Sequence, residues 1–356
     1  INILSQKIFF MKYFSFNVFI FIFVSQLSQL LRRFFLVQKK IFRASILDFL
    51  NYFIFYFLLF SSLFIIEIEL TIDKVFLFFN ISLVFGLLVF SGCEDGSEDF
   101  EVSKVPSTFT KKVLIEEFTG AWCGYCPDGA HIVESIINDN NGKVVGVSLH
   151  SGDAMEVAHT NFLETTYQNT GYPSGMVDRV SVNGNTCINR GYWEYVASDQ
   201  LTKTAVCGLA IISEVNGKNA TVEVHAGFNT TLSGEFRLTV YLIEDDVTGT
   251  GYGYDQRNYY NTVAESPFYN LGDPIEGYEH NHTLRAILSE SLGDAIMVSE
   301  MASGGEHIET YTVDLSSYNK NNLSIVAFVT KISSTIAEHE IMNVQKCDID
   351  GFQDWD

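Results

Sequence analysis

Hydrophobic and polar positions along residues 105–204 follow a pattern that predicts strands alternating with helices. The apolar run Lys112–Phe118 is rich in strand-forming residues, and apolar residues at the i, i+3, i+4 spacing of a helix come after it. Further strands are predicted at 143–149 and 175–182, and further helices at 154–168 and 192–203. This order of elements is typical of an α/β domain, in which helices pack on a central sheet.

From residue 205 onward, short alternating apolar runs are separated by polar turns. About seven strands are predicted, at 207–214, 220–228, 235–244, 284–289, 309–315, 323–331 and 338–345. Their spacing predicts an all-β domain over 205–356, an antiparallel sandwich of immunoglobulin-like type. A stretch rich in Asp, Gly and Tyr at about 245–282 interrupts the pattern, and loops of that length are often functional or mobile.

The first 92 residues differ from the rest of the chain in composition. They hold 21 of the 30 Phe and three apolar runs, at about 13–24, 52–66 and 75–92. The last run follows Asp73 and Lys74, and a charged start, an apolar run and a small-residue exit are the layout of a secretory signal peptide. We therefore expect a signal peptide at 71–92, and we interpret 1–70 as a gene-model extension or an extra membrane segment.

Residues 93–356 are strongly acidic, with 14 Lys and Arg against 39 Asp and Glu. Nucleic-acid binding needs clustered Lys and Arg that neutralise phosphates, and this part of the sequence has no such cluster. The acidity also argues against adsorption to an anionic membrane through a basic patch. The composition fits an exported domain that self-repulsion keeps soluble.

A Cys-x-x-Cys pair, Cys123 and Cys126, stands between the first predicted strand and the first predicted helix. The N-terminus of a helix offers free N–H groups and a positive dipole potential, and both stabilise a thiolate. Cys123 is therefore predicted to be the nucleophile, and Cys126 is predicted to resolve the mixed disulfide. Half of a zinc site or an inert disulfide are the alternatives, but no second Cys/His pair stands at ligand spacing.

The sequence Trp-Cys-Gly-Tyr-Cys at 122–126 resembles the active site of the thioredoxin superfamily, and the resemblance covers the whole predicted α/β domain. It implies that Glu117, six residues before the first cysteine, is a buried acid that moves protons for the resolving thiol. It also places Trp122, Gly124 and Tyr125 in the substrate groove. Reducing thioredoxins carry Gly-Pro between the cysteines, so the Gly-Tyr found here leaves the redox direction open.

The same superfamily carries a cis-proline loop that faces the disulfide. Gly-Tyr-Pro-Ser-Gly at 171–175 stands at a compatible distance in the sequence. The resemblance implies a cis bond before Pro173, a bond rare enough to serve a purpose, and a Tyr172 backbone that pairs with an extended substrate. An ordinary turn proline is the alternative.

Ser91-Gly92-Cys93, at the end of the third apolar run, resembles a bacterial lipobox, with Phe90 in place of the usual Leu. The resemblance implies that Cys93 is lipidated and becomes the first residue of the mature protein. Residues 93–104 then form an acidic tether. A plain thiol after a transmembrane helix is the alternative.

Four histidines carry weaker signals. His131 and His150 follow the motif and the second strand, where either could tune the thiolate, although surface imidazoles are the simpler interpretation. His280 and His282 follow Glu279 at a spacing compatible with a metal, but the signal is weak and no metal site is predicted.

The remaining cysteines leave their pairing open. Cys207 and Cys347 fall on the first and last predicted strands of the β-rich part. A disulfide between them is one option, and it would leave Cys187 unpaired.

Several stretches together resemble the outer-membrane-protein-28-related lipoproteins of Gram-negative bacteria. They are 116–126, 171–179, 280–285 and 343–346. The resemblance implies a lipid-anchored protein of the cell envelope, in the outer membrane on its periplasmic or surface face. It implies little about the substrate.

The leading hypothesis is a lipid-anchored thiol–disulfide oxidoreductase that needs no cofactor beyond its redox-active pair. Cys123 attacks, Cys126 resolves and Glu117 relays the proton, and the partners are extracytoplasmic proteins with thiols or disulfides. The alternative is a surface-exposed binding or adhesion lipoprotein in which the β-domain is functional and the redox domain structural. The intact cysteine pair favours the first hypothesis, and the large β-domain with its aromatic loop favours the second.

Overall fold

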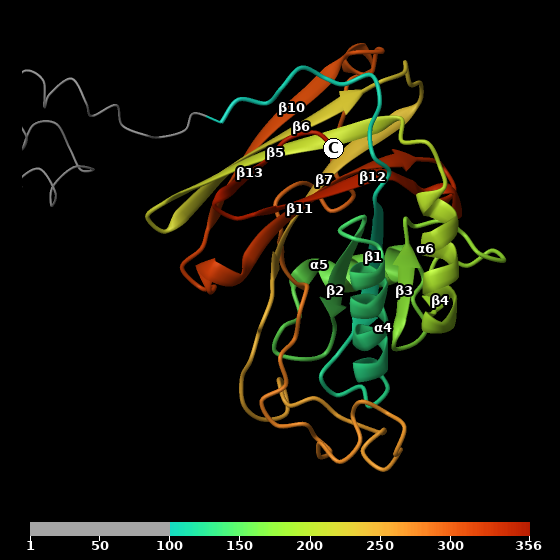
Figure 1. The fold of residues 1–356 in the computed structure, drawn as a ribbon, viewed down its shortest axis with the longest axis vertical. Coiled ribbons are helices and arrows are strands. Elements are labelled where there is room, and N and C mark those ends of the chain that lie inside the picture. Colours follow the sequence, from blue (N-terminus) through green and yellow to red (C-terminus); the bar gives the residue numbers. More distant parts are fainter. Residues whose placement is uncertain (1–99) are drawn as a thin grey trace, which may run out of the picture. The chain divides into compact units, whose positions relative to one another are not determined.

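The computed structural model describes residues 100–356, so the predictions for 1–70, for 71–92 and for Cys93 lie outside the described residues. The described part is mostly β-sheet, with two sheets and few helices (Figure 1). Its α-helices are α4 (Cys126–Asp139), α5 (Ala158–Thr166) and α6 (Trp193–Leu201). Short 3-10 helices occupy Arg190–Tyr192, Val298–Glu300, Lys320–Asn322 and Ile336–Glu338. Within residues 100–356, no helix is both long and apolar enough to cross a membrane.

The larger sheet has nine strands in the order β12-β11-β7-β8-β2-β1-β3-β4, with β9 paired to β7. They are β1 (Val113–Thr119), β2 (Val144–His150), β3 (Ser174–Val177), β4 (Ile188–Asn189), β7 (Glu235–Glu244), β8 (Thr283–Ile287), β9 (Asp294–Ala295), β11 (Leu323–Ile332) and β12 (Glu340–Asp348). The smaller sheet has four, in the order β10-β6-β5-β13. They are β5 (Cys207–Asn216), β6 (Asn219–Phe228), β10 (Glu306–Asp314) and β13 (Gly351–Gln353).

Strand β1 lies at the centre of the region that carries the cysteine motif, and all of its residues are buried. It pairs with β2 in parallel and with β3 antiparallel. On one face, Val113 and Ile115 pack with residues of α4 and α6, among them Trp193. On the other face, Leu114 and Phe118 belong to a core that includes side chains of β7, β11 and β12. A strand covered on both faces reads as a continuous apolar run, which is the pattern that predicted it.

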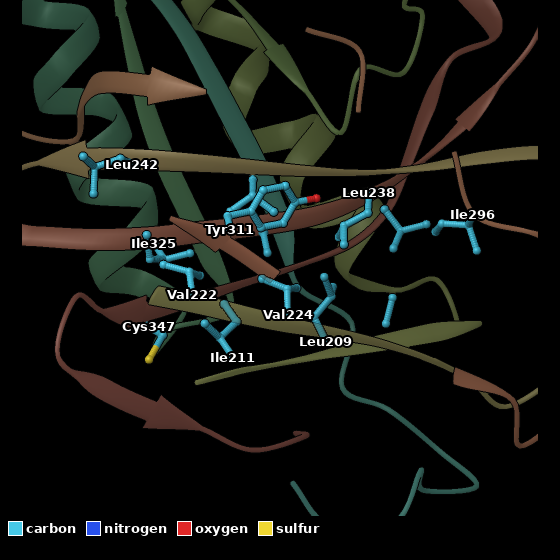
Figure 2. Close-up of a cluster of buried hydrophobic side chains, with 14 of the residues drawn as sticks. Leu209, Ile211, Val222, Val224, Leu238, Leu242, Ile296, Tyr311, Ile325 and Cys347 are labelled. Carbon is cyan, nitrogen blue, oxygen red and sulfur yellow. The ribbon is translucent and has the colours of Figure 1, made fainter. Parts of the chain in front are cut away.

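The two sheets pack face to face over an apolar core, so the predicted antiparallel sandwich is present (Figure 2). Side chains that alternate along each strand point into this core. They include Leu209 and Ile211 of β5, Val222 and Val224 of β6, Leu238 and Leu242 of β7, and Ile325 of β11.

The larger sheet runs through both parts of the chain that the sequence separated near residue 205. Strand β8 joins them, because it pairs antiparallel with β7 and, at Thr283, in parallel with Ser148 of β2. One sheet of the sandwich is therefore continuous with the sheet beside the cysteine motif. The period of apolar residues identifies strands but does not say which strands pair, so this continuity could not be predicted.

Each predicted strand has a counterpart in the structure, several of them with shifted ends, and the short strands β4, β9 and β13 were not predicted. Two differences at element ends have a clear physical cause. The predicted strand 175–182 ends at Val177, because Asp178 and Arg179 take positive φ values of 46° and 56° and turn the chain. The predicted helix 154–168 shortens to 158–166. The carboxylate of Asp153 accepts hydrogen bonds from the backbone N–H groups of Ala121 and Met155 and so fixes the preceding segment as a turn.

Candidate functional site

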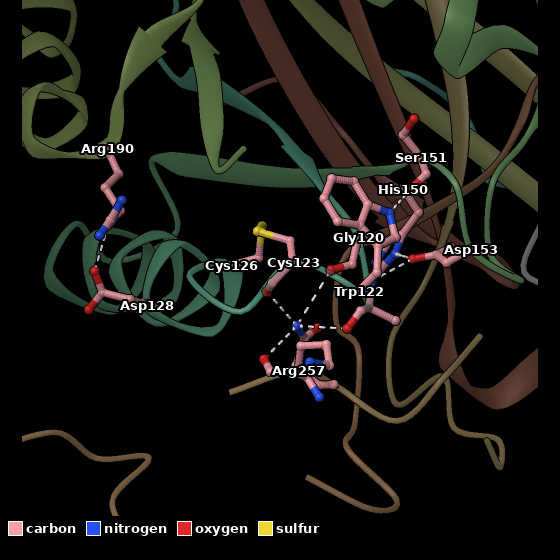
Figure 3. The surroundings of a disulfide bond; sticks show 12 residues. Gly120, Trp122, Cys123, Cys126, Asp128, His150, Ser151, Asp153, Arg190 and Arg257 are labelled. Carbon is pink, nitrogen blue, oxygen red and sulfur yellow. Dashed lines mark hydrogen bonds and ion pairs between the residues drawn. A yellow bond between two sulfur atoms is a disulfide. The ribbon is translucent and has the colours of Figure 1, made fainter. Parts of the chain in front are cut away.

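The predicted nucleophile and resolving cysteine are brought together at the start of α4. Cys123 and Cys126 form a disulfide with their Cα atoms 5.4 Å apart (Figure 3). Cys126 is the first residue of the helix and Cys123 lies in the turn before it, with side chains 1% and 5% exposed. Both sulfurs therefore lie at the positive end of the helix dipole, where a thiolate is stabilised once the disulfide is reduced.

The predicted acid, Glu117, is buried in β1 directly beneath the first turn of α4. Neither carboxyl oxygen has a hydrogen-bond partner. A Cβ added at Gly129 would lie 2.3 Å from Oε1 of Glu117, so this glycine leaves the space that the carboxyl group fills. Burial raises the pKa of Glu117 to about 8. The positive charges of His282 and Arg190 lower this pKa, but by less than burial raises it. The group is poised to exchange a proton near neutral pH.

Glu117 and Cys126 line the same cavity, of about 200 Å³. Its other polar lining residues include Glu134 of α4, Ser148 and His150 of β2, and His280 at the end of the long loop before β8. A polar space of this size holds several water molecules. Water can therefore connect the acid to the resolving thiol.

The histidines at this cavity differ from one another in charge and partners. His150 is buried, with Nδ1 2.7 Å from Oδ2 of Asp153, so it is not the surface imidazole that we expected. Burial, reinforced by the nearby charge of His150, lowers the pKa of His280 to about 4, and its ring lies against that of His150. His282 instead pairs with Glu134 and Asp245, each at 3.1 Å.

These pairings do not form a metal centre. Nε2 of His280 bonds the backbone carbonyl of Tyr254 at 2.8 Å, while the carboxylates of Glu134 and Asp245 pair with His282. Throughout residues 100–356, no three His, Cys, Asp or Glu side chains converge as a metal site. His131 is exposed on α4 with its ring near Phe268.

Two of the predicted groove residues, Trp122 and Tyr172, pack against each other next to the cysteine motif. The Trp122 indole donates a hydrogen bond to the carbonyl of Ser151 (2.7 Å), as Figure 3 shows, and its ring meets Tyr172 edge-on at 5.1 Å. The Tyr172–Pro173 bond is cis, as predicted. Burial, together with the hydrogen bond to Glu164, raises the pKa of Tyr172 to about 12. Tyr172 is therefore an uncharged hydrogen-bond donor in this groove.

The long loop between β7 and β8 covers the cysteine turn, and its contribution was not predicted. Gly124 packs against Tyr259, whose backbone N–H bonds the Gly124 carbonyl at 2.9 Å. The side-chain amide of Gln256 donates to backbone carbonyls of the turn, including that of Cys123 at 2.9 Å. The one sequence signal for this role is the length of the loop. The sequence does not show where the loop packs.

A rim of polar and aromatic groups continues the site on the outer side of α4. Arg190 bonds the carboxylate of Asp128 at 2.6 Å and the hydroxyl of Tyr260 at 2.9 Å. Tyr125, from the dipeptide between the cysteines, is 51% exposed and lies edge-on to Tyr259. The surface beside the disulfide is therefore largely aromatic.

The other three described cysteines are free thiols. Cys207 and Cys347 are both buried and do not form the disulfide that we considered. Burial raises the pKa of each of these two thiols to about 12. Cys187 is also free, and burial likewise raises its pKa to about 12. Among the described cysteines, the disulfide joins Cys123 and Cys126 alone.

The sequence pattern of the family described as outer membrane protein Omp28 matches residues 160–352, more than half of the chain. The chain belongs to the Omp28 outer membrane protein family. This membership confirms the family part of the predicted resemblance and indicates a location in the outer membrane or cell envelope. The match begins after Cys126, so it does not by itself describe the cysteine pair.

Solved structures match this Omp28 chain at low sequence identity. HBP35 of Porphyromonas gingivalis matches with 22% identity and a TM-score of 0.55, over 68% of this chain and 76% of that one. A crystal structure of a protein from Agrobacterium tumefaciens matches at 13% identity and a TM-score of 0.43, over 68% of this chain and 97% of that one. The first likeness concerns the fold alone, and the second is too weak to support an argument. No curated protein matches the chain.

Proposed function

We propose that this Omp28-family protein is a thiol–disulfide oxidoreductase of the cell envelope, with a thioredoxin-like fold over residues 105–204. Its partners would be extracytoplasmic proteins that carry thiols or disulfides. The observation that carries the proposal is Glu117, a fully buried carboxyl group without a hydrogen-bond partner in the cavity that Cys126 lines. Burying such a group is costly. A disulfide with a purely structural role needs no acid beside it.

The reaction follows from the positions of these groups. In the reduced enzyme, the Cys123 thiolate attacks one sulfur of a partner disulfide, and the partner's other sulfur leaves as a thiolate. Glu117 then takes the proton of the Cys126 thiol through water in the cavity. The Cys126 thiolate attacks Sγ of Cys123, which re-forms the enzyme disulfide and releases the partner's second thiol. The partner is reduced by two electrons and the enzyme is oxidised by two.

Each step also runs in reverse, with protonated Glu117 returning its proton to Cys126. A pKa of about 8 keeps both forms of the acid populated near neutral pH. The direction of net electron flow is then set by the potential of the partner and not by the acid.

The test is a trap for the mixed disulfide. In Cys126→Ala the resolving thiol is gone, so covalent adducts between Cys123 and partner proteins should accumulate. Cys123→Ala/Cys126→Ala is the matched control and should give none. The reduction potential of the unmodified pair is measured in parallel. A potential far below about −300 mV, typical of structural disulfides, together with no adduct, would refute the proposal.

We further propose that Cys93 carries the lipid that anchors the protein. The support is the Ser-Gly-Cys sequence at 91–93, together with membership of an outer membrane protein family. Mass spectrometry of the purified protein should find a diacylated Cys93 at the mature N-terminus, and Cys93→Ser should release the protein from membranes. A mature chain that continues upstream of an unmodified Cys93 would contradict the assignment.

A further inference from the structure

The loop between β7 and β8 is fastened to the cysteine turn by a row of hydrogen bonds. The side-chain amide of Gln256, itself 2% exposed, lies 2.9 Å from the carbonyl oxygen of Cys123, 3.2 Å from that of Ala121 and 3.4 Å from that of Gly120. The backbone N–H of Arg257 adds a bond of 2.7 Å to the carbonyl of Ala121. Figure 3 shows the bonds to the carbonyl oxygens of Gly120 and Cys123 meeting beside Arg257. None of them involves a sulfur atom, so they do not depend on the oxidation state of the pair.

The loop is also braced internally. The side-chain amide of Asn258 donates to the carbonyls of Phe268 and Gly272, both at 2.9 Å. Gln256 and Ile275 exchange two backbone hydrogen bonds, of 3.1 and 2.7 Å. A long loop with this many internal bonds holds its shape, and it can therefore keep a side chain in a fixed place over the site.

Tyr259 is the side chain that this loop places at the disulfide. A Cβ added at Gly124 would lie 2.4 Å from the Tyr259 ring, so the ring rests on the backbone between the two cysteines. On its other side the ring meets Tyr125 edge-on at 5.0 Å. Under this cover Cys123, the attacking residue of the proposed function, is 5% exposed. Tyr259 therefore lies at the cysteine motif, beside a nearly buried Cys123.

We propose that Tyr259 is a specificity-determining residue that limits Cys123 to small or extended thiol and disulfide partners. This inference rests on the proposed function. Gln256 is the positioning residue that holds the loop in place. A disulfide displayed on the surface of a folded protein meets the Tyr259 ring before it meets Cys123. A small molecule or an extended peptide strand passes beside the ring.

Two probes with the same chemistry and different size test this proposal on the reduced full-length protein. One is 2,2′-dithiodipyridine, and the other is a folded protein whose single surface cysteine carries the same pyridyl disulfide. In both, the Cys123 thiolate forms a bond to the probe sulfur and pyridine-2-thione leaves, which absorbance detects. Cys123→Ser gives the background from the other thiols. The measured quantity is the ratio of the small-probe rate to the protein-probe rate.

In Tyr259→Ala this ratio should fall about tenfold, the low end of what one contact in a binding pocket discriminates. Gln256→Met, which keeps the side-chain volume and removes the donors, should lower it in the same direction. Tyr252→Ala is the matched control, because Tyr252 lies in the same loop, is 75% exposed and is not among the residues that contact the cysteine turn. It should leave the ratio unchanged.

The proposal is overturned if the Tyr259→Ala ratio equals that of the unmodified protein, or if Tyr252→Ala lowers it equally. Both activated disulfides react to completion with any accessible thiolate, whatever the reduction potential of the pair. Failure of the oxidoreductase proposal would appear in the potential and in the Cys126→Ala trap. Failure of this inference would appear in the rate ratio alone.

Discussion

Two adjacent glutamates of β1 are buried to the same extent and have opposite surroundings. The side chains of Glu116 and Glu117 are both 1% exposed. Glu116 accepts hydrogen bonds from Nε and Nη2 of Arg179, at 2.7 and 2.8 Å, and from the hydroxyl of Tyr241 at 3.0 Å. Glu117 has no partner at either oxygen. Because neighbouring side chains of a strand point to opposite faces, one sequence step separates these two environments.

The difference separates a carboxylate that is paired from one that is not. The side chain of Glu116 lies on the face of β1 that packs with side chains of β7, β11 and β12. Its bonds to Arg179, in the turn after β3, and to Tyr241 of β7 connect these three elements. The Glu117 face looks toward α4 and the disulfide, where an ion pair would fix the charge and prevent proton transfer. A buried acid with all its partners stabilises a fold, whereas a buried acid without partners is a candidate for chemistry.

The largest expected effect comes from removing the partner of Glu116. Arg179→Leu leaves a buried carboxylate without its cation, and such changes cost about 3–5 kcal/mol. Urea denaturation should show this loss in the free energy of unfolding. The double variant Glu116→Leu/Arg179→Leu should recover much of it, because it removes the stranded charge. A loss below about 1 kcal/mol in the single variant would show that the pair does not hold the two regions together.

The second effect falls on activity. Glu117→Gln keeps the shape of the side chain and cannot carry the proton, so disulfide exchange at pH 7 should slow on the order of a hundredfold. Below pH 4.5, where the carboxyl group of Glu117 is protonated in the folded protein and largely protonated in the unfolded chain, the free energy of unfolding should change by less than about 1 kcal/mol, since no hydrogen bond of Glu117 is lost. Stopped-flow kinetics of the resolving step measures the first quantity and urea denaturation the second. An unchanged rate would remove Glu117 from the mechanism.

The third effect is a pH dependence that Glu117 alone should contribute. Its pKa is raised from 4.5 to about 8 on folding, so between these values the folded protein binds more protons than the unfolded chain. This contribution to stability is therefore complete below pH 4.5, falls as the pH rises, and is lost above about pH 8. The difference in unfolding free energy between the unmodified protein and Glu117→Gln isolates it from other groups. A difference that does not vary between pH 5 and 8 would contradict the raised pKa.

The smallest effect concerns a partly exposed ion pair near the same helix. Arg190 bonds Asp128 at 2.6 Å, but the two side chains are 23% and 31% exposed. Solvent screens such pairs, so Arg190→Leu should change the free energy of unfolding by about 0–1 kcal/mol. Comparing Arg190→Leu with Arg179→Leu tests whether the loss in free energy of unfolding depends on the burial of the ion pair or only on the presence of a pair. Equal losses in the two variants would remove that distinction.

The stretch 171–179 illustrates how far residues of a motif can be understood before the structure. Its Tyr-Pro pair was predicted to carry a cis bond, and the bond is cis. The Asp-Arg pair that ends it had no assigned role. In the structure Asp178 accepts hydrogen bonds from Lys111 and from the backbone N–H of Leu114, at 2.6 and 2.9 Å, and Arg179 reaches Glu116. Each of these partners lies more than 60 residues away in the chain.

The sequence by itself determined the strands, the cysteine pair at a helix start, the buried acid and the cis proline, because each follows from local pattern or from a short motif. It did not determine that one sheet runs through both parts, that Glu116 and Glu117 diverge, or that a loop from the β-rich part covers Cys123. These features depend on contacts between segments that are distant in the sequence. Such contacts do not produce a periodic pattern of hydrophobic residues, so the sequence does not reveal them. The resemblance pointed to Glu117, but only the tertiary structure showed that Glu116 has partners and Glu117 has none.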